Sequence, residues 1–186
     1  MIRVAAGESV DTDRPAARDR QETTVEADDA TIGEETVEPV SRDSVVVGHD
    51  GSGDAGTALA TALSFAEDLH APVVVVRAWS IATAPRPKDW TFGYVSSAAE
   101  MQQAVLDQLV NNTKQLVERF PHVTVTFRAV HASPARSLIE ASAEARMLVV
   151  GTRGAGGFAE MVLGSVSDQV VRHAQCPVLV TRSNEN

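Results

Sequence analysis

Spaced glycines and serines between residues 151 and 167 have the pattern of an anion-binding loop. Gly151 and Gly154 precede Gly164, which is followed by Ser165 and, two positions later, by Ser167. Because glycine has no Cβ, its backbone can take left-handed angles and approach a ligand closely. A helix is expected to begin near Ser165, and its first amides and positive dipole end favour an anion. The pattern therefore predicts a phosphate site, with the two serine hydroxyls as additional donors.

Two charged side chains in glycine-rich stretches could complete such a site. Arg153 lies between the first two glycines and would add positive charge. Asp50, in the stretch GHDGSGDAG, is placed to accept hydrogen bonds from a ribose or a purine, or else to order its own turn. The simpler interpretation of the whole set is that the glycines make turns and the serines cap a helix. His49 is expected to be an ordinary loop residue.

A dinucleotide site is a second interpretation of the first glycine-rich stretch. Residues 51–56, GSGDAG, fit the pattern GxGxxG, and Arg77 near the end of a later strand could meet a 2′-phosphate, which would indicate NADP. A single match of this kind is weak, and the folded part of the chain leaves no second domain to hold a hydride acceptor. The P-loop pattern GxxxxGK[ST] is absent.

Catalytic and metal-binding signatures are missing from the sequence. It contains no GxSxG, HExxH or CxxC pattern, and its five histidines are scattered. We therefore expect no metal site made by the protein alone. Cys176, the only cysteine, precedes a proline at the start of an apolar run and is expected to be a packed thiol.

Alternating strands and helices are expected to position these residues. Short, unbroken apolar runs are typical of strands that are covered on both faces. Such runs occupy residues 44–48, 71–79, 123–131, 146–151 and 176–182. Helical patterns lie between them, the first with Asp54 placed to cap it. Five strands and four helices in alternation predict a parallel α/β sheet, whose ligands bind beyond the carboxyl ends of the strands.

The first 43 residues differ from the rest in charge and composition. They hold twelve acidic residues and five arginines, so −7 of the total net charge of −9 belongs to them. Few large apolar residues occur there, and we expect a disordered acidic tail followed by one folded domain over residues 44–186. The nearly neutral remainder argues against nucleic acid as a partner. We expect neither a membrane span nor a secretory leader, which with the single cysteine favours the cytoplasm.

Residues 44–182 resemble the universal stress protein family. The family's nucleotide motif G-x2-G-x9-G-[ST] is matched by Gly151, Gly154, Gly164 and Ser165. The following VS, the ending HAQCPVLV and the opening VVVGHDGS are also similar to the family. Two positions depart from it: ARMLVV lacks the usual Asp, and Ala-Ser-Pro at 132–134 replaces Gly-Asp-Pro.

The resemblance implies a fold and a set of ligand contacts. The fold is a flavodoxin-like, adenine nucleotide alpha hydrolase-like sandwich of three layers, with a five-stranded parallel sheet in the order 3-2-1-4-5. ATP would lie across the carboxyl edge of the sheet, with Asp50 facing ribose and adenine and the backbone of Ala78 meeting the adenine edge. The residues implied around the ribose and phosphates are Val150, Gly151, Arg153, Gly154, Gly164, Ser165, Val166 and Ser167.

The resemblance also implies partners and a role. Mg²⁺ or Mn²⁺ would accompany the nucleotide, the last strand would pair two copies into a homodimer, and an unidentified protein would receive the signal of a stress-response regulator. AMP and cyclic AMP share the adenosine part of ATP and remain alternatives. No general base stands near an expected water, so we expect at most slow ATP hydrolysis. A nucleotide-free dimeric interaction module is the second hypothesis.

An aromatic connection is particular to this sequence. Trp79, Trp90 and Tyr94 lie within or at the edge of residues 79–95. They either close over a bound nucleotide as a lid or cover the rim of the sheet.

Overall fold

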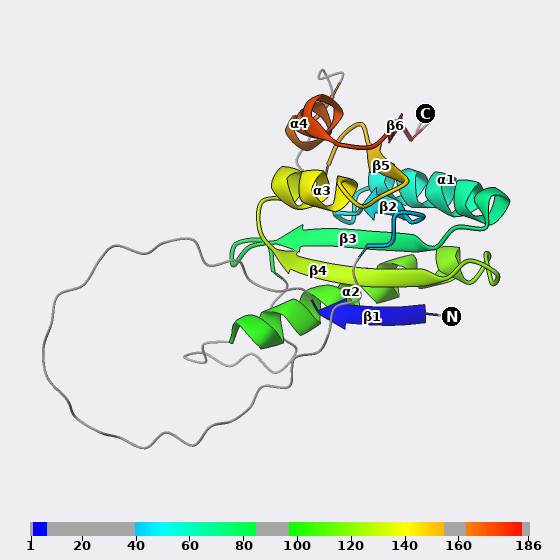
Figure 1. The fold of residues 1–186 in the computed structure, drawn as a ribbon. Helices are drawn as coiled ribbons and strands as arrows, with labels where there is room; N and C mark the ends of the chain where they lie inside the picture. Colours follow the sequence, from blue (N-terminus) through cyan, green and yellow to red (C-terminus); the bar gives the residue numbers. More distant parts are fainter. Residues whose placement is uncertain (1, 7–39, 85–96, 155–162, 184–186) are drawn as a thin grey trace, which may run out of the picture.

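A parallel sheet forms the centre of the molecule in the computed structural model, which describes residues 2–6, 40–84, 97–154 and 163–183. The strands are β1 (Ile2–Ala6), β2 (Val45–Gly48), β3 (Val73–Trp79), β4 (Val125–His131), β5 (Met147–Gly151) and β6 (Val178–Thr181). The helices are α1 (Gly53–Leu69), α2 (Ala98–Val117), α3 (Pro134–Ser142) and α4 (Ser165–His173). The order across the sheet is β1-β4-β3-β2-β5-β6, as Figure 1 shows.

The five expected strands and their order are confirmed. Counted from β2, they lie in the order 3-2-1-4-5, and every pair is parallel. Val45 of β2 lies opposite Val73 on one side and Met147 on the other. The chain therefore leaves β2 toward β3 and later returns to the other side of β2, which creates a switch point between β2 and β5.

The first residues of the chain differ from the expectation of a tail without structure. Ile2–Ala6 forms β1, which extends the sheet in parallel beside β4, with Ile2 opposite Val125 and Ala6 opposite Ala129. A strand at the edge of a sheet has unpaired backbone groups, so a short apolar segment such as IRVAA can join it. The strand was not predicted because the composition of residues 1–43 as a whole is acidic. Residues 7–39 lie outside the described residues, and the boundary at residue 44 stays a prediction.

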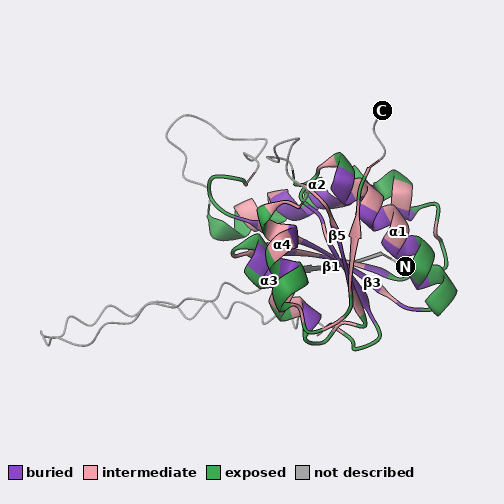
Figure 2. Cartoon of the chain, turned by 90° about the horizontal axis from the view of Figure 1, so that it is seen from above, coloured by how far each residue is buried: buried purple, intermediate pink, exposed green. Residues whose placement is uncertain are grey.

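Apolar layers cover both faces of the sheet. Figure 2 shows buried residues along the strands and on the inner sides of the helices. On the face covered by α1 and α2 the core includes Val45, Val47, Leu59, Leu63, Val73, Val75, Leu106, Leu109 and Phe127. On the face covered by α3 and α4 it includes Val46, Val74, Val76, Leu138, Leu148, Val150 and Val170. Burial on both faces explains why the strands are unbroken apolar runs.

The helix starts follow local signals with one exception. Ser97 and Glu100 form the predicted capping box of α2, and Pro134 occupies the first turn of α3. The expectation that Asp54 caps α1 is wrong, because Ser52 is the N-cap and its hydroxyl accepts a hydrogen bond from the amide of Ala55 at 3.2 Å. Asp54 is the second residue of the helix, and its side chain forms hydrogen bonds with residues outside α1.

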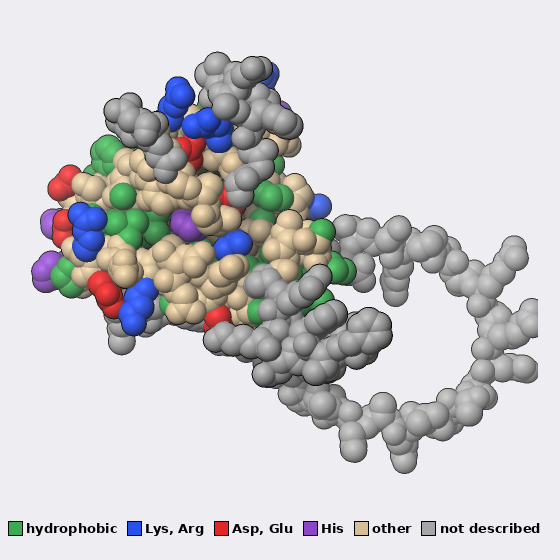
Figure 3. Space-filling model, turned by 180° about the vertical axis from the view of Figure 1, so that it is seen from behind, with side chains coloured by type: hydrophobic (Ala, Val, Ile, Leu, Met, Phe, Trp, Pro, Cys, Tyr) green, Lys and Arg blue, Asp and Glu red, His purple; other side chains and the backbone are tan. Residues whose placement is uncertain are grey.

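The described surface has mixed charge and no membrane span. On the face drawn in Figure 3, Lys and Arg side chains are spread over the surface among acidic and uncharged ones. None of the described helices is both long and apolar enough to cross a bilayer. Cys176 packs against the core beside α3 and α4, and burial raises the pKa of its thiol, as suits a packed cysteine.

Candidate functional site

The two glycine-rich loops meet at the carboxyl edge of the sheet. β2 and β5 are neighbours and parallel, so the loops that follow them emerge side by side. Their contact is close, since a Cβ added to Gly154 would lie only 2.5 Å from Oδ2 of Asp50. The expected meeting of the two loops is confirmed, with the Asp50 carboxylate facing the backbone of the second loop.

The loop between β2 and α1 has a tightly determined backbone. The amide of Ser52 donates to Oδ1 of Asp50 at 3.0 Å, which orders the turn. Gly51 has a φ of 92°, a left-handed conformation that favours glycine. Among the described glycines it is the one with such an angle, so the expectation of left-handed angles at Gly151, Gly154 and Gly164 is wrong.

Gly151 is required by packing between α1 and β5. A Cβ at this position would lie 2.8 Å from the Cβ of Asp54 and 2.9 Å from its backbone carbonyl carbon. The first turn of α1 therefore approaches the end of β5 too closely for any side chain. This gives the first glycine of the motif a structural reason that does not depend on a ligand.

Gly164 starts α4 without the help of a side chain. It is the N-cap, with φ −73° and ψ 163°, and within the described residues no side chain caps the helix there. Its own amide donates to the carbonyl of Thr152 at 2.7 Å, which fixes the helix start against the end of β5. The next amides of α4 have no partner inside the helix, because a helix lacks preceding carbonyls for them. They form a set of donors with partial positive charge.

The two serines of α4 have different surroundings. Ser165 is exposed, at the first position of the helix. Ser167 is buried, and its hydroxyl donates to the carbonyl of Thr152 at 2.9 Å and to that of Gly164 at 3.0 Å. Ser167 thus holds the loop onto the helix, while contacts of either hydroxyl with a phosphate stay predictions.

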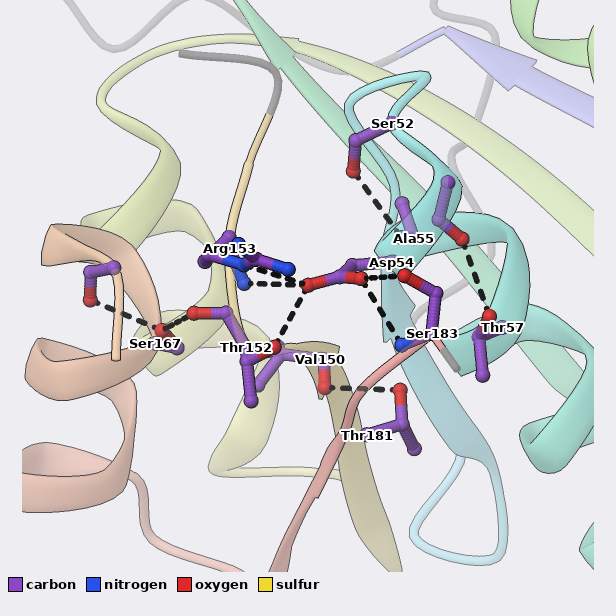
Figure 4. Close-up of polar contacts among 12 residues, drawn as sticks. Ser52, Asp54, Ala55, Thr57, Val150, Thr152, Arg153, Ser167, Thr181 and Ser183 are labelled. Atoms are coloured by element: carbon purple, nitrogen blue, oxygen red, sulfur yellow. Dashed lines mark hydrogen bonds and ion pairs between the residues drawn. The ribbon is translucent and has the colours of Figure 1, made fainter. Parts of the chain in front are cut away.

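Asp54 is the polar residue of this edge that sequence reasoning missed. It is 5% exposed, and its Oδ2 accepts hydrogen bonds from Thr152 Oγ1 at 2.7 Å and from the amide of Arg153 at 3.1 Å. Its Oδ1 accepts from the amide of Ser183 at 3.0 Å and from the hydroxyl of the same residue. Figure 4 shows these donors converging on the carboxylate from the ends of β5 and β6. No spacing signal could have found it, because its partners are about 100 or more positions away.

The charge of Asp54 is maintained by these donors. Burial raises the pKa of its carboxyl, but the hydrogen bonds from Ser183, Thr152 and Arg153 outweigh burial and hold the pKa well below its usual range. Arg153 Nε lies 3.6 Å from Oδ2, so a partly exposed positive charge remains beside the loop.

The end of β3 supplies the other side of the edge. Ala78 is half-buried and lies opposite Val130 in the register of β3 and β4. The guanidinium of Arg77 is near the first loop, with Nη1 3.7 Å from a Cβ placed on Gly51. That nitrogen is buried and has no hydrogen-bond partner among the described residues. The adenine contact of the Ala78 backbone stays a prediction.

Val150 and Val166 lie inward from the loops. Val150 is 4% exposed in the core beside α3 and α4, and Val166 packs against the same core. They pack in the core beneath the end of β5 and the start of α4. Contact of either side chain with a ligand stays a prediction.

His49 is more deeply placed than an ordinary loop residue. It is 6% exposed, and its Nδ1 has no partner among the described residues. The pKa of His49 is lowered from 6.5 to about 4, chiefly by burial and to a smaller extent by Arg77, against the raising effect of Asp50. The imidazole is therefore neutral at neutral pH.

Trp79 belongs to the core rather than to the connection that follows it. It is 2% exposed and stacks on His131 with ring centroids 4.4 Å apart. For this tryptophan the covering role is the one observed. Trp90 and Tyr94 lie outside the described residues, and a lid made by them stays a prediction.

Two hollows in the described surface lie away from this edge. One of about 480 Å³ is lined by residues that include His70, Pro72 and His122, and another of about 260 Å³ by residues that include Arg128 and Glu140. Neither contains a residue of the two loops. The converging polar groups, rather than depth, distinguish the carboxyl edge.

The fold and the edge together define a class of protein. An open parallel sheet with two glycine-containing loops at its switch point is typical of α/β proteins that bind ligands at the carboxyl edge. Residues 41–182 match the family model described as the universal stress protein family. The chain therefore belongs to the universal stress protein family, which confirms the resemblance seen in its motif.

Individual relatives agree with this assignment. The chain is 35% identical over 140 residues to universal stress protein Rv2623 of Mycobacterium tuberculosis, an alignment that covers 75% of this chain and 45% of the relative. It spans about half the length of the curated relatives that it matches.

Solved structures share the fold. A universal stress protein in complex with cAMP has a TM-score of 0.56 and 24% identity, covering 75% of this chain and 96% of that one. The universal stress protein from Archaeoglobus fulgidus in complex with dAMP has a TM-score of 0.53 and 19% identity, covering 74% and 96%.

Proposed function

We propose that this chain binds an adenine nucleotide, ATP in the first place, between the loops after β2 and β5, and acts as a nucleotide-dependent regulator in a stress response. The start of α4 carries the proposal, because its amides face the same edge as Asp50 and no described side chain caps them. Two neighbours of the same fold bind cAMP and dAMP, which supports an adenine nucleotide as the ligand.

Each part of the nucleotide has a proposed partner. The phosphates would lie on the first amides of α4, that of Ser167 included, with the Ser165 hydroxyl and Arg153 adding donors. Asp50 would accept from the ribose or adenine, and the backbone of Ala78 would meet the adenine edge. Val150, Gly151, Gly154, Gly164 and Val166 would complete the walls. AMP and cyclic AMP differ from ATP only in how far their phosphates reach.

A divalent ion would depend on the nucleotide. The described residues include no group of three or more His, Cys, Asp and Glu side chains arranged to hold a metal ion. Mg²⁺ or Mn²⁺ would therefore be held mainly by the phosphate oxygens and would neutralise part of their charge.

β6 is the proposed contact between two copies. Its four residues are half-buried at the end of the sheet opposite β1. Pairing of two such edges would satisfy their backbone groups and protect their apolar side chains. We place the dimer in the cytoplasm, where nucleotide occupancy would be read by a protein partner.

Gly164→Glu tests the proposed phosphate contact. The added carboxylate would occupy the start of α4, so we expect ATP binding in calorimetry to be lost while circular dichroism shows a folded protein. Gly56→Glu is the matched control, since a Cβ at Gly56 meets nothing within 4 Å and the position lies within α1. Equal ATP affinity in Gly164→Glu and the parent would contradict the proposal.

The ligand itself can be identified directly. Mass spectrometry of small molecules released from the purified, denatured protein should find an adenine nucleotide. Nicotinamide dinucleotide would instead support the GxGxxG interpretation, and an empty protein that also fails to bind ATP would support the nucleotide-free dimeric module.

A further inference from the structure

Asp54 directs its carboxylate away from its own helix. A carboxylate in the first turn of a helix ordinarily caps that turn or stays in solvent, but Ser52 already caps α1. The side chain of Asp54 instead reaches donors on two other elements, which Figure 4 shows on either side of it. Oδ2 accepts from Thr152 and Arg153 after β5, and Oδ1 accepts from Ser183 after β6.

Thr152 passes this contact on to α4. Its hydroxyl donates to Asp54, while its carbonyl accepts from the amide of Gly164 at 2.7 Å and from the hydroxyl of Ser167 at 2.9 Å. A continuous hydrogen-bonded path therefore runs from the first turn of α1, through Thr152, to the first turn of α4. The position of the α4 amides depends on where Asp54 holds Thr152.

We propose that Asp54 is a positioning residue, which holds the loop after β5 in its nucleotide-binding conformation and couples that loop to Ser183 at the end of β6. The proposal rests on the nucleotide site proposed above. Asp54, Thr152, Arg153 and Ser183 are called here the Asp54 clamp.

Charge explains why a carboxylate is suited to this place. An aspartate has only acceptor atoms when ionised, and all four described hydrogen bonds to Asp54 are donated to it. The amide of an asparagine would turn one acceptor into a donor that faces other donors. Asp54 also orients Arg153, whose Nε lies 3.6 Å from it, so the positive charge stays beside the start of α4.

The loop after β5 and Ser183 are coupled because both form hydrogen bonds with the carboxylate of Asp54. A ligand that orders Thr152 and Arg153 fixes Oδ2 and thereby favours the contact of Oδ1 with Ser183. Thermodynamic linkage requires the converse, so ordering at Ser183 favours the nucleotide-binding loop by the same factor. Since Ser183 is two residues beyond β6, the strand proposed to pair two copies, nucleotide occupancy and the state of that edge become linked.

Calorimetry of Asp54→Asn with two ligands separates positioning from general stability. We expect affinity for ATP to fall about tenfold or more, as for loss of a charged hydrogen-bond network. Affinity for adenosine, which has no phosphate, should stay within about twofold. Asp68→Asn, an exposed carboxylate at the other end of α1, is the matched control and should change neither. Equal loss for both ligands, or no loss for ATP, would overturn the proposal.

Amide hydrogen exchange measured by NMR tests the coupling without any ligand. Ser183→Ala should speed exchange at the amide of Arg153, and Thr152→Val should speed exchange at the amide of Ser183, although neither replaced side chain contacts the amide observed. Unchanged exchange at both amides would overturn the clamp. These two variants also serve if Asp54→Asn fails to fold. A parent protein that binds neither ATP nor adenosine would defeat the proposed function, and the exchange data would then still decide for or against the clamp.

Discussion

Two helices begin at the same edge of the sheet and begin differently. α1 starts at Ser52, whose hydroxyl accepts from the amide of Ala55, while α4 starts at Gly164 with no described side chain as a cap. In α1 the side chain of Ser52 thus binds one of the first amides, whereas no described side chain does so in α4. The difference supports the proposal that the phosphates bind at the start of α4 rather than at the start of α1.

The comparison also bears on the dinucleotide interpretation. GSGDAG leads into α1, where a pyrophosphate would need the first amides of the helix. Ser52 already caps that start, where its hydroxyl binds the amide of Ala55. This favours the start of α4, beside Arg153, as the proposed anion site.

The largest expected effect on stability is the pH dependence due to His49, in the loop before α1. Its pKa is about 4 in the folded protein against 6.5 when unperturbed. The unfolded chain therefore binds the proton first as pH falls, and stability present above pH 6.5 is lost progressively toward pH 4. The loss is about 3 kcal/mol. Urea unfolding of the parent and His49→Gln at both pH values should show a flatter profile in the variant, and parallel profiles would contradict this.

Gly151→Ala tests the close approach of α1 to the end of β5. The new Cβ would meet the Cβ and backbone of Asp54 below 3.0 Å, so α1 must shift away from the strand. We expect a loss of about 2 kcal/mol in the free energy of unfolding. Gly56→Ala, in open space within α1, should instead be neutral or stabilising. If both alanines had the same small effect in urea unfolding, the close approach of α1 to β5 would be refuted.

Ser52→Ala has the smallest expected effect on stability. It removes the side-chain cap of α1 and so leaves that helix start uncapped, as in α4. Removing the cap should lower the free energy of unfolding by about 1 kcal/mol, because the amide of Ala55 loses its acceptor. ATP affinity measured by calorimetry should be unaffected. A large loss of ATP affinity without loss of stability would mean that the start of α1, and not that of α4, binds the phosphates.

Apolar runs predicted most of the fold, because strands covered on both faces must be apolar along their whole length. The order of β2 to β6 followed from the family resemblance, and both glycine loops were placed at the correct edge. β1 was not predicted because Ile2–Ala6 is short and pairs with β4, which lies more than 100 residues later in the sequence. Its partner could not be inferred from local composition.

The motif located the candidate site but not its support. Gly151 and Gly164 were expected to serve ligand approach, whereas close packing against Asp54 and the carbonyl of Thr152 also restricts them. Asp54 carries no pattern of its own, since its donors at Thr152 and Ser183 become neighbours only when β5 and β6 are placed beside α1. Tertiary hydrogen bonds of this kind depend on the assembled sheet.

A titration of the protein with ATP followed by backbone NMR tests the central claim most directly. Binding at the uncapped helix predicts large, saturable shifts of the Ser165 and Val166 amides, and little change at the amide of Ala55, which Ser52 already binds. Saturable shifts confined to the start of α1, or no shifts at either helix, would contradict the account.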